Sequence, residues 1–104
     1  MRDYALIDKI RTVLRDLIPS SRVLLYGSQA RGDAGPDSDV DLLILTPGLI
    51  SNETEQSIIS SLYDVELEYG TIISSLIMPE GLWQEKEGKH PFSINVKKES
   101  IPLL

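Results

Sequence analysis

The sequence has no cysteine and only one histidine, and it has no long apolar run. The absence of cysteine excludes a disulfide framework, a cysteine-based zinc site and a thiol nucleophile. No apolar run approaches the roughly 18 residues that a membrane span requires. The first residues, "MRDYALIDKIRTVL", carry acids and bases within their apolar pattern, unlike a signal peptide. We therefore expect a cytoplasmic protein with no membrane partner.

Basic residues are also few, with 10 Lys and Arg against 16 Asp and Glu and a net charge of −6. A protein that binds nucleic acid through its phosphates needs a basic surface, so we predict no direct nucleic-acid binding. A length of 104 residues with 41% apolar residues is typical of one globular domain. We expect a single domain over residues 1–104.

The spacing of apolar residues predicts a helix-first α/β order. The predicted elements are a helix over 3–18, strands over 22–26 and 39–46, a helix over 52–69, a strand over 71–78, two short helical turns within 80–100 and an edge strand over 101–104. The second helix is predicted to bury Ile58, Ile59, Leu62, Val65 and Tyr69. This order favours the α/β (α+β) class, with a small mixed sheet packed against helices.

Two aspartates stand at the head of the second predicted strand, which is otherwise apolar. Because side chains alternate along a strand, Asp39 and Asp41 would project from one face, about 7 Å apart at Cα. Two carboxylates this close repel each other unless a cation lies between them. Mg²⁺ takes one or two carboxylates together with the phosphates of a substrate. We therefore predict that Asp39 and Asp41 are the metal-binding and catalytic carboxylates of a nucleotide site.

A glycine-containing turn directly follows the first predicted strand. Glycine at position 27 lets the backbone approach a ligand closely, and N–H groups of a tight turn can bind an anion. The Ser28 hydroxyl and the Arg31 guanidinium could add contacts to a phosphate. We predict that Gly27, Ser28 and Arg31 bind the nucleotide.

Other interpretations of this loop fit the residues less well. No G-x-x-x-x-G-K-[ST] is present, which excludes a P-loop. An EF-hand would need glycine where Leu42 stands and glutamate where Gly48 stands. A purely structural loop, in which Asp and Gly only form turns, explains each motif alone but not their combination.

The combined motif is G-S-x₁₀-D-x-D, within "LYGSQARGDAGPDSDVDLLI". It resembles the DNA polymerase β-like nucleotidyltransferase superfamily, and specifically its minimal nucleotidyltransferase (MNT) branch. The resemblance implies a mixed sheet packed on helices that binds Mg²⁺ and a nucleoside triphosphate and transfers a nucleoside monophosphate. It assigns the triphosphate to Gly27 and Ser28 and the metal to Asp39 and Asp41. Members of this branch often act as antitoxins of HEPN-domain ribonucleases, and some transfer AMP from ATP to a tyrosine of that partner.

The sequence departs from the superfamily pattern in one respect. A third carboxylate is common on the strand after the second helix, but "TIISSLIM" contains no acid, and Ser74 or Ser75 stands near the expected position. Glu66 and Glu68 lie just upstream, but two residues apart on a helix they cannot share a face. Activation of the attacking hydroxyl would be weakened more than nucleotide binding.

Three functions follow from these residues together with what the resemblance implies. The first is Mg²⁺-dependent transfer of AMP onto a HEPN partner; the second is an antitoxin that neutralises the partner by binding alone. Transfer to a small hydroxylated molecule such as an antibiotic is the third, which the short chain disfavours. A site on one side of a small sheet also predicts completion by a partner or by a second copy of the chain.

Overall fold

The computed structural model describes residues 4–32 and 39–104. In chain order its elements are α1 (Tyr4–Leu17), β1 (Arg22–Tyr26), α2 (Ser28–Arg31), β2 (Val40–Thr46), α3 (Asn52–Tyr69), β3 (Ile73–Pro79), α4 (Glu80–Lys86), α5 (Pro91–Glu99) and β4 (Ile101–Pro102). This order confirms the predicted fold class. The 80–100 segment forms two defined helices, and the second strand begins at Val40, so that Asp39 lies just before it.

The sheet has the strand order β3-β2-β1-β4. Strand β1 pairs antiparallel with β2 and with β4, whereas β2 pairs parallel with β3. The sheet is therefore mixed, as predicted. The C-terminal strand β4 lies at one edge and contains a proline, which an edge position tolerates.

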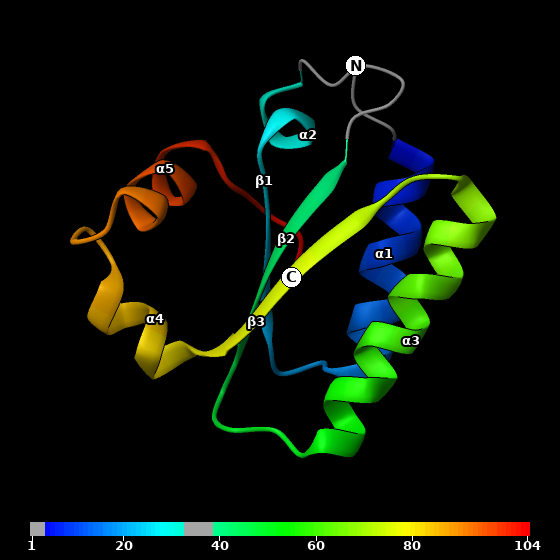
Figure 1. The fold of residues 1–104 in the computed structure, drawn as a ribbon, viewed down its shortest axis with the longest axis horizontal. Helices are drawn as coiled ribbons and strands as arrows, with labels where there is room; N and C mark the ends of the chain where they lie inside the picture. Colours follow the sequence, from blue (N-terminus) through cyan, green and yellow to red (C-terminus); the bar gives the residue numbers. More distant parts are fainter. Residues whose placement is uncertain (1–3, 33–38) are drawn as a thin grey trace.

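Helices α1 and α3 cover one face of the sheet (Figure 1). The main core lies between them and alternate residues of the strands, among them Val23, Leu25, Val40, Leu42, Ile44 and Ile73. Helix α1 presents Leu6, Ile10 and Leu14 to this core at the three- and four-residue spacing of its apolar stripe. The face is closed along the length of these strands.

Helices α4 and α5 lie on the opposite face (Figure 1). There Trp83 of α4 and Val96 of α5 pack against Leu43, Leu45 and Leu24 in a second, smaller cluster. The central residues of β2, Leu42 to Leu45, are consequently buried from both sides, as their continuous apolar run predicts.

Helix α3 is bounded as its sequence predicts, but its buried face is narrower. The Ser51 hydroxyl accepts a hydrogen bond from the Thr54 N–H at 3.1 Å, and Gly70 ends the helix in the left-handed conformation. The prediction that Ile59 is buried is wrong, because 44% of its surface is exposed. It lies about 60° around the helix from Leu62, away from the sheet. Among the described residues, no helix is long and apolar enough to cross a membrane.

Candidate functional site

The strand register brings the glycine turn and the aspartate pair together. In the antiparallel pair of β1 and β2, Tyr26 lies opposite Asp41. Gly27 follows Tyr26 directly, and Asp39 precedes β2 by one residue. Two segments that are separate in the sequence thus meet at one end of the sheet, beside α2 (Figure 1).

Gly27 is fixed by two independent constraints. Its φ of 74° and ψ of −155° lie in a region that is essentially restricted to glycine. A Cβ atom at this position would lie 2.5 Å from Oδ2 of Asp41. Only a residue without a side chain therefore lets the turn approach the Asp41 carboxylate this closely.

The Asp41 carboxyl is half-buried and has neighbours of both charge signs. Burial and the negative charge of Asp39 raise its pKa, and the positive charge of Arg31 partly offsets this. The first two effects disfavour the carboxylate form, so a bound cation between the two aspartates would stabilise it. This is the electrostatic pattern expected of a metal-binding pair.

Arg31 lies at the end of α2 and is bound to α5. Its Nη1 donates to Oε2 of Glu99 at 3.1 Å, and its charge also acts on Asp41. The predicted phosphate ligand is thus close to the aspartate and at the same time paired with another carboxylate. Nothing in the local sequence of Glu99 indicates this role, because 68 residues separate the two partners.

Tyr26 is a second neighbour of the site, opposite Asp41 in the strand pair. Burial and the nearby Asp41 charge raise the pKa of its hydroxyl, which therefore remains protonated at neutral pH. Its ring contacts Phe92 of α5 edge-to-face, with centroids 5.5 Å apart. Phe92 thereby links α5 to the strand that precedes the glycine turn.

Among the residues that the structure describes, no third acid completes a metal site with the aspartate pair. Ser74 is the residue of β3 that lies opposite Asp41, in the position predicted from the sequence. Oε1 of Glu66 instead accepts a hydrogen bond from the Ile73 N–H at 2.8 Å, at the start of β3. No group of three acidic, histidine or cysteine side chains suited to a metal occurs in residues 4–32 and 39–104.

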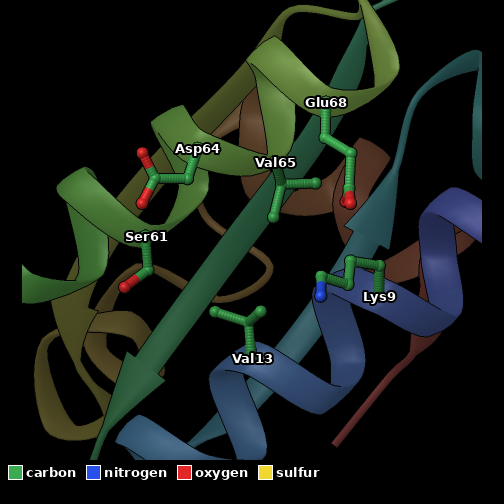
Figure 2. Close-up of a pocket in the computed structure, with 6 residues that line it drawn as sticks. All are labelled: Lys9, Val13, Ser61, Asp64, Val65 and Glu68. Carbon is green, nitrogen blue, oxygen red and sulfur yellow. The ribbon is translucent and has the colours of Figure 1, made fainter.

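Glu68 lies on the other side of the molecule. Figure 2 shows it extending from α3 towards α1, into a groove that Lys9 and Val13 also line. This groove of about 310 Å³ is on the side of the sheet covered by α1 and α3, away from the face that carries Asp41. Glu68 is therefore not a candidate for the third carboxylate.

The residues present fit a magnesium ion. Carboxylate oxygens are the ligands that Mg²⁺ prefers, and one or two of them suffice when phosphates complete its coordination. Asp39 and Asp41 provide two carboxylates next to a turn whose backbone is open to close approach. A metal held by protein ligands alone would need more donors than this pair offers.

Comparison with known proteins identifies relatives of the whole fold. The model of the nucleotidyltransferase domain family matches residues 7–103. A Methanocaldococcus jannaschii protein with a provisional assignment as a protein adenylyltransferase is 41% identical over 68 residues, which cover 65% of this chain and 67% of that relative.

Solved structures share the same fold at lower identity. A chain of a toxin–antitoxin crystal structure with AMP-PNP superposes with a TM-score of 0.63 and 20% identity, covering 94% of this chain and 72% of its own length. A chain from the complex of the tri-AMPylated Shewanella oneidensis HEPN toxin with an MNT antitoxin gives a TM-score of 0.58 and 17% identity. The match covers 97% of this chain and 71% of that chain. These likenesses establish the arrangement of helices and strands.

Proposed function

Because this chain belongs to the nucleotidyltransferase domain family, we propose that it transfers AMP from ATP to a hydroxyl group of a partner protein. The observation that carries the proposal is the contact between the Gly27 turn and the Asp41 carboxylate, where a Cβ would lie 2.5 Å away. This contact supports the proposal because nucleotidyl transfer requires a turn that can bind a phosphate next to a carboxylate that can bind a metal.

The transfer is a substitution at the α-phosphorus of ATP. The acceptor oxygen forms a new P–O bond, the bond to the bridging oxygen breaks, and pyrophosphate leaves. Mg²⁺, when bound, neutralises charge on the phosphates. Gly27 and Ser28 would hold the triphosphate, Asp39 and Asp41 would hold the metal, and Arg31 would contact a phosphate after leaving Glu99.

The acceptor proton has no dedicated carboxylate to receive it in the described part of the chain, since Ser74 lies opposite Asp41. It would pass to solvent at the open end of the sheet. We therefore expect slow transfer whose rate rises with pH. Two causes act in the same direction: more of the acceptor hydroxyl is ionised, and more Asp41 is in its charged form despite its raised pKa.

The partner we propose is a HEPN-domain protein encoded beside this chain, with which it forms a toxin–antitoxin pair in the cytoplasm. Two structural neighbours come from toxin–antitoxin complexes, and one of these contains an AMPylated HEPN toxin. The relative of 41% identity, which carries the protein adenylyltransferase assignment, supports a protein as the acceptor.

The decisive test incubates the full chain and its co-encoded HEPN protein with Mg²⁺ and ATP labelled at the α-phosphate. We expect label on the HEPN protein with the unchanged chain and none with the D39N/D41N variant. A control variant, D64N/E68Q, removes two carboxylates from α3 on the other side of the sheet and should retain transfer. Label that persists in D39N/D41N would contradict the proposal.

A second function is favoured by a specific observation, the serine opposite Asp41. It stands on the strand where the superfamily pattern commonly has a third carboxylate. In this alternative the chain neutralises its partner by binding alone and the nucleotide site is vestigial. Co-expression separates the two. If D39N/D41N still protects cells from the toxin, binding suffices; if it binds the toxin without protecting, transfer is required.

A further inference from the structure

An apolar pocket of about 210 Å³ lies between β3 and the α4–α5 pair. Leu76 and Met78 of β3, Trp83 of α4 and Phe92 of α5 contribute its apolar walls. Phe92 and Trp83 meet edge-to-face with centroids 6.3 Å apart. No part of the proposed transfer reaction uses this pocket.

The pocket lies on the same face of the sheet as the Asp41 carboxylate. In the parallel pair of β2 and β3, Asp41 lies opposite Ser74, and two residues further along Leu43 lies opposite Leu76. Alternate residues of a strand share a face, so Ser74 and Leu76 point to the same side, about 7 Å apart. Phe92 also contacts Tyr26, the partner of Asp41 on the other strand.

The interior offers no free hydrogen-bonding group to its occupant. The one hydroxyl in its lining belongs to buried Ser93, whose Oγ lies 2.8 Å from the carbonyl oxygen of Lys86 and accepts the Gly88 N–H at 3.2 Å. These bonds hold the α4–α5 turn. A nucleobase would lose its hydrogen bonds with water here and gain none, whereas an aliphatic or aromatic side chain loses nothing.

The strand that forms one wall of the pocket has an open edge. Strand β3 is the terminal strand of the sheet, and no strand of the described chain pairs with its outer side. Its sequence, "ISSLIMP", contains no charged residue, although charges commonly protect exposed edges. Such an edge can accept an extended segment through main-chain hydrogen bonds, with specificity from pockets that take alternate side chains.

We propose that the acceptor segment of the partner binds as an extended strand along the outer edge of β3 and inserts an apolar side chain into this pocket. The residue that receives AMP is two positions from this anchor, so that it lies level with Ser74 and Asp41. Lys86, an exposed residue of the pocket lining, favours an acidic residue close to the anchor. The inference rests on the proposed function for the identity of the transferred group, but the binding itself does not.

The spacing follows from the strand geometry. Two residues of an added strand advance by the same distance that separates Leu76 from Ser74, and both side chains point to the same face. The added strand would lie about 10 Å from β2, which is two strand spacings. A long acceptor side chain could cross the small Ser74 to reach Asp41.

The test uses fluorescent synthetic peptides and the unmodified full chain, with anisotropy measured in the absence of nucleotide. One peptide carries Asp-Leu-Gly-Tyr and a second the reversed order Tyr-Gly-Leu-Asp; in two further peptides the leucine is moved next to the tyrosine or replaced by serine. We expect one of the peptides with the two-residue spacing to bind at least about tenfold more tightly than the serine peptide, because burial of the leucine is lost in the latter. Equal binding of the leucine and serine peptides would overturn the inference.

Edge pairing has its own test. In an added strand, the N–H groups of the leucine and of the adjacent glycine point in opposite directions. N-methylation of one of them should abolish binding of the tighter peptide, and N-methylation of the other should leave it unchanged. Equal effects of both modifications would contradict pairing along β3.

Matched variants locate the pocket. Leu76 and Leu82 are exposed to similar extents, 40% and 43%, but only Leu76 lines the pocket. L76S should weaken binding of the tighter peptide about tenfold, whereas L82S should leave its binding unchanged. Equal weakening by both would contradict the pocket as the binding site.

Transfer from labelled ATP to the same peptides separates the two proposals. Leucine-dependent binding without transfer would support the docking site and contradict the adenylyltransferase function. Transfer that does not depend on the spacing would support the adenylyltransferase function and contradict the docking site.

Discussion

The two faces of the sheet are built from alternate residues of the same strands, yet they differ in how they are covered. Helices α1 and α3 close one face completely, so that Val40, Leu42 and Ile44 are buried there. On the other face, Trp83 and Val96 cover Leu43 and Leu45, and among the described residues this cluster does not include Asp41. We expect stability to be concentrated in the face covered by α1 and α3, whereas the candidate site lies at the end of the second face.

The comparison also explains why a buried strand can begin with carboxylates. A rigid strand, buried on both sides at Leu42 to Leu45, fixes the backbone position of Asp41. The partial burial that raises the Asp41 pKa comes from the same arrangement. Four predictions test this division between the two faces.

The largest effect is expected from the closed face. L42A removes a fully buried side chain from the main core and should lower the free energy of unfolding by about 2–5 kcal/mol. L76A, on the open face, should lower it by about 1 kcal/mol or less, because the side chain already contacts water. Urea unfolding measures both. Equal losses would show that the two faces contribute alike.

The second prediction concerns the glycine turn at the open end. G27A imposes an unfavourable backbone conformation and a contact of 2.5 Å with Asp41. G70A has a comparable positive φ of 63° and open space around the added Cβ. Both should lose about 1–3 kcal/mol of unfolding free energy, but only G27A should also reduce ATP affinity, by tenfold or more. Unchanged ATP affinity in G27A would separate the turn from the nucleotide site.

The third prediction follows from the raised pKa of Asp41. Between the ordinary pKa of an aspartate and the raised value, the folded state binds more protons than the unfolded state, so stability falls as pH rises through this interval. D41N should therefore be more stable than the unchanged chain at neutral pH without Mg²⁺, and this advantage should disappear at a pH below the ordinary aspartate pKa. Thermal unfolding across pH measures it, with D64N as the control. An advantage that grows on acidification would contradict the assignment.

The smallest effect is expected at the ion pair that joins α2 to α5. E99Q removes the ion pair between Glu99 and Arg31, and an exposed pair of this kind contributes about 0–1 kcal/mol. Loss of this pair should leave urea unfolding almost unchanged and raise ATP affinity slightly at low salt. E87Q, which removes the partner of Lys97, is the matched control and should not alter ATP affinity. A loss of affinity in E99Q would show that Glu99 positions Arg31 for phosphate instead of competing with it.

Most of the secondary structure could be predicted from the sequence because its determinants are local. Helix α1 is marked by the periodicity of its apolar residues and ends two residues before Pro19, and Ser51 caps α3. Each of these signals acts within a few residues of the chain. The burial of Ile59 and the extent of α4 and α5 were not predictable in the same way. Whether an apolar residue on the margin of a helix is covered depends on which element packs beside it.

The candidate site was half predictable. The spacing of Gly27, Ser28, Asp39 and Asp41 identified the motif, and their roles in binding remain predictions. Glu99, Tyr26 and Phe92 gave no sequence signal, because each reaches the site through strand pairing or helix packing. Excluding Glu68 likewise required knowledge of the face on which it lies.

The sequence by itself determined the helices and strands, the apolar run that is buried from both sides, and the motif that marks a nucleotidyltransferase. These depend on side-chain periodicity and turn chemistry, which act between neighbours in the chain. Only the tertiary structure decided that Gly27 touches Asp41, that Ser74 lies opposite Asp41, and that an apolar pocket and an open strand edge lie beside them. The order and register of strands are set by packing between distant segments, and no local pattern contains that information.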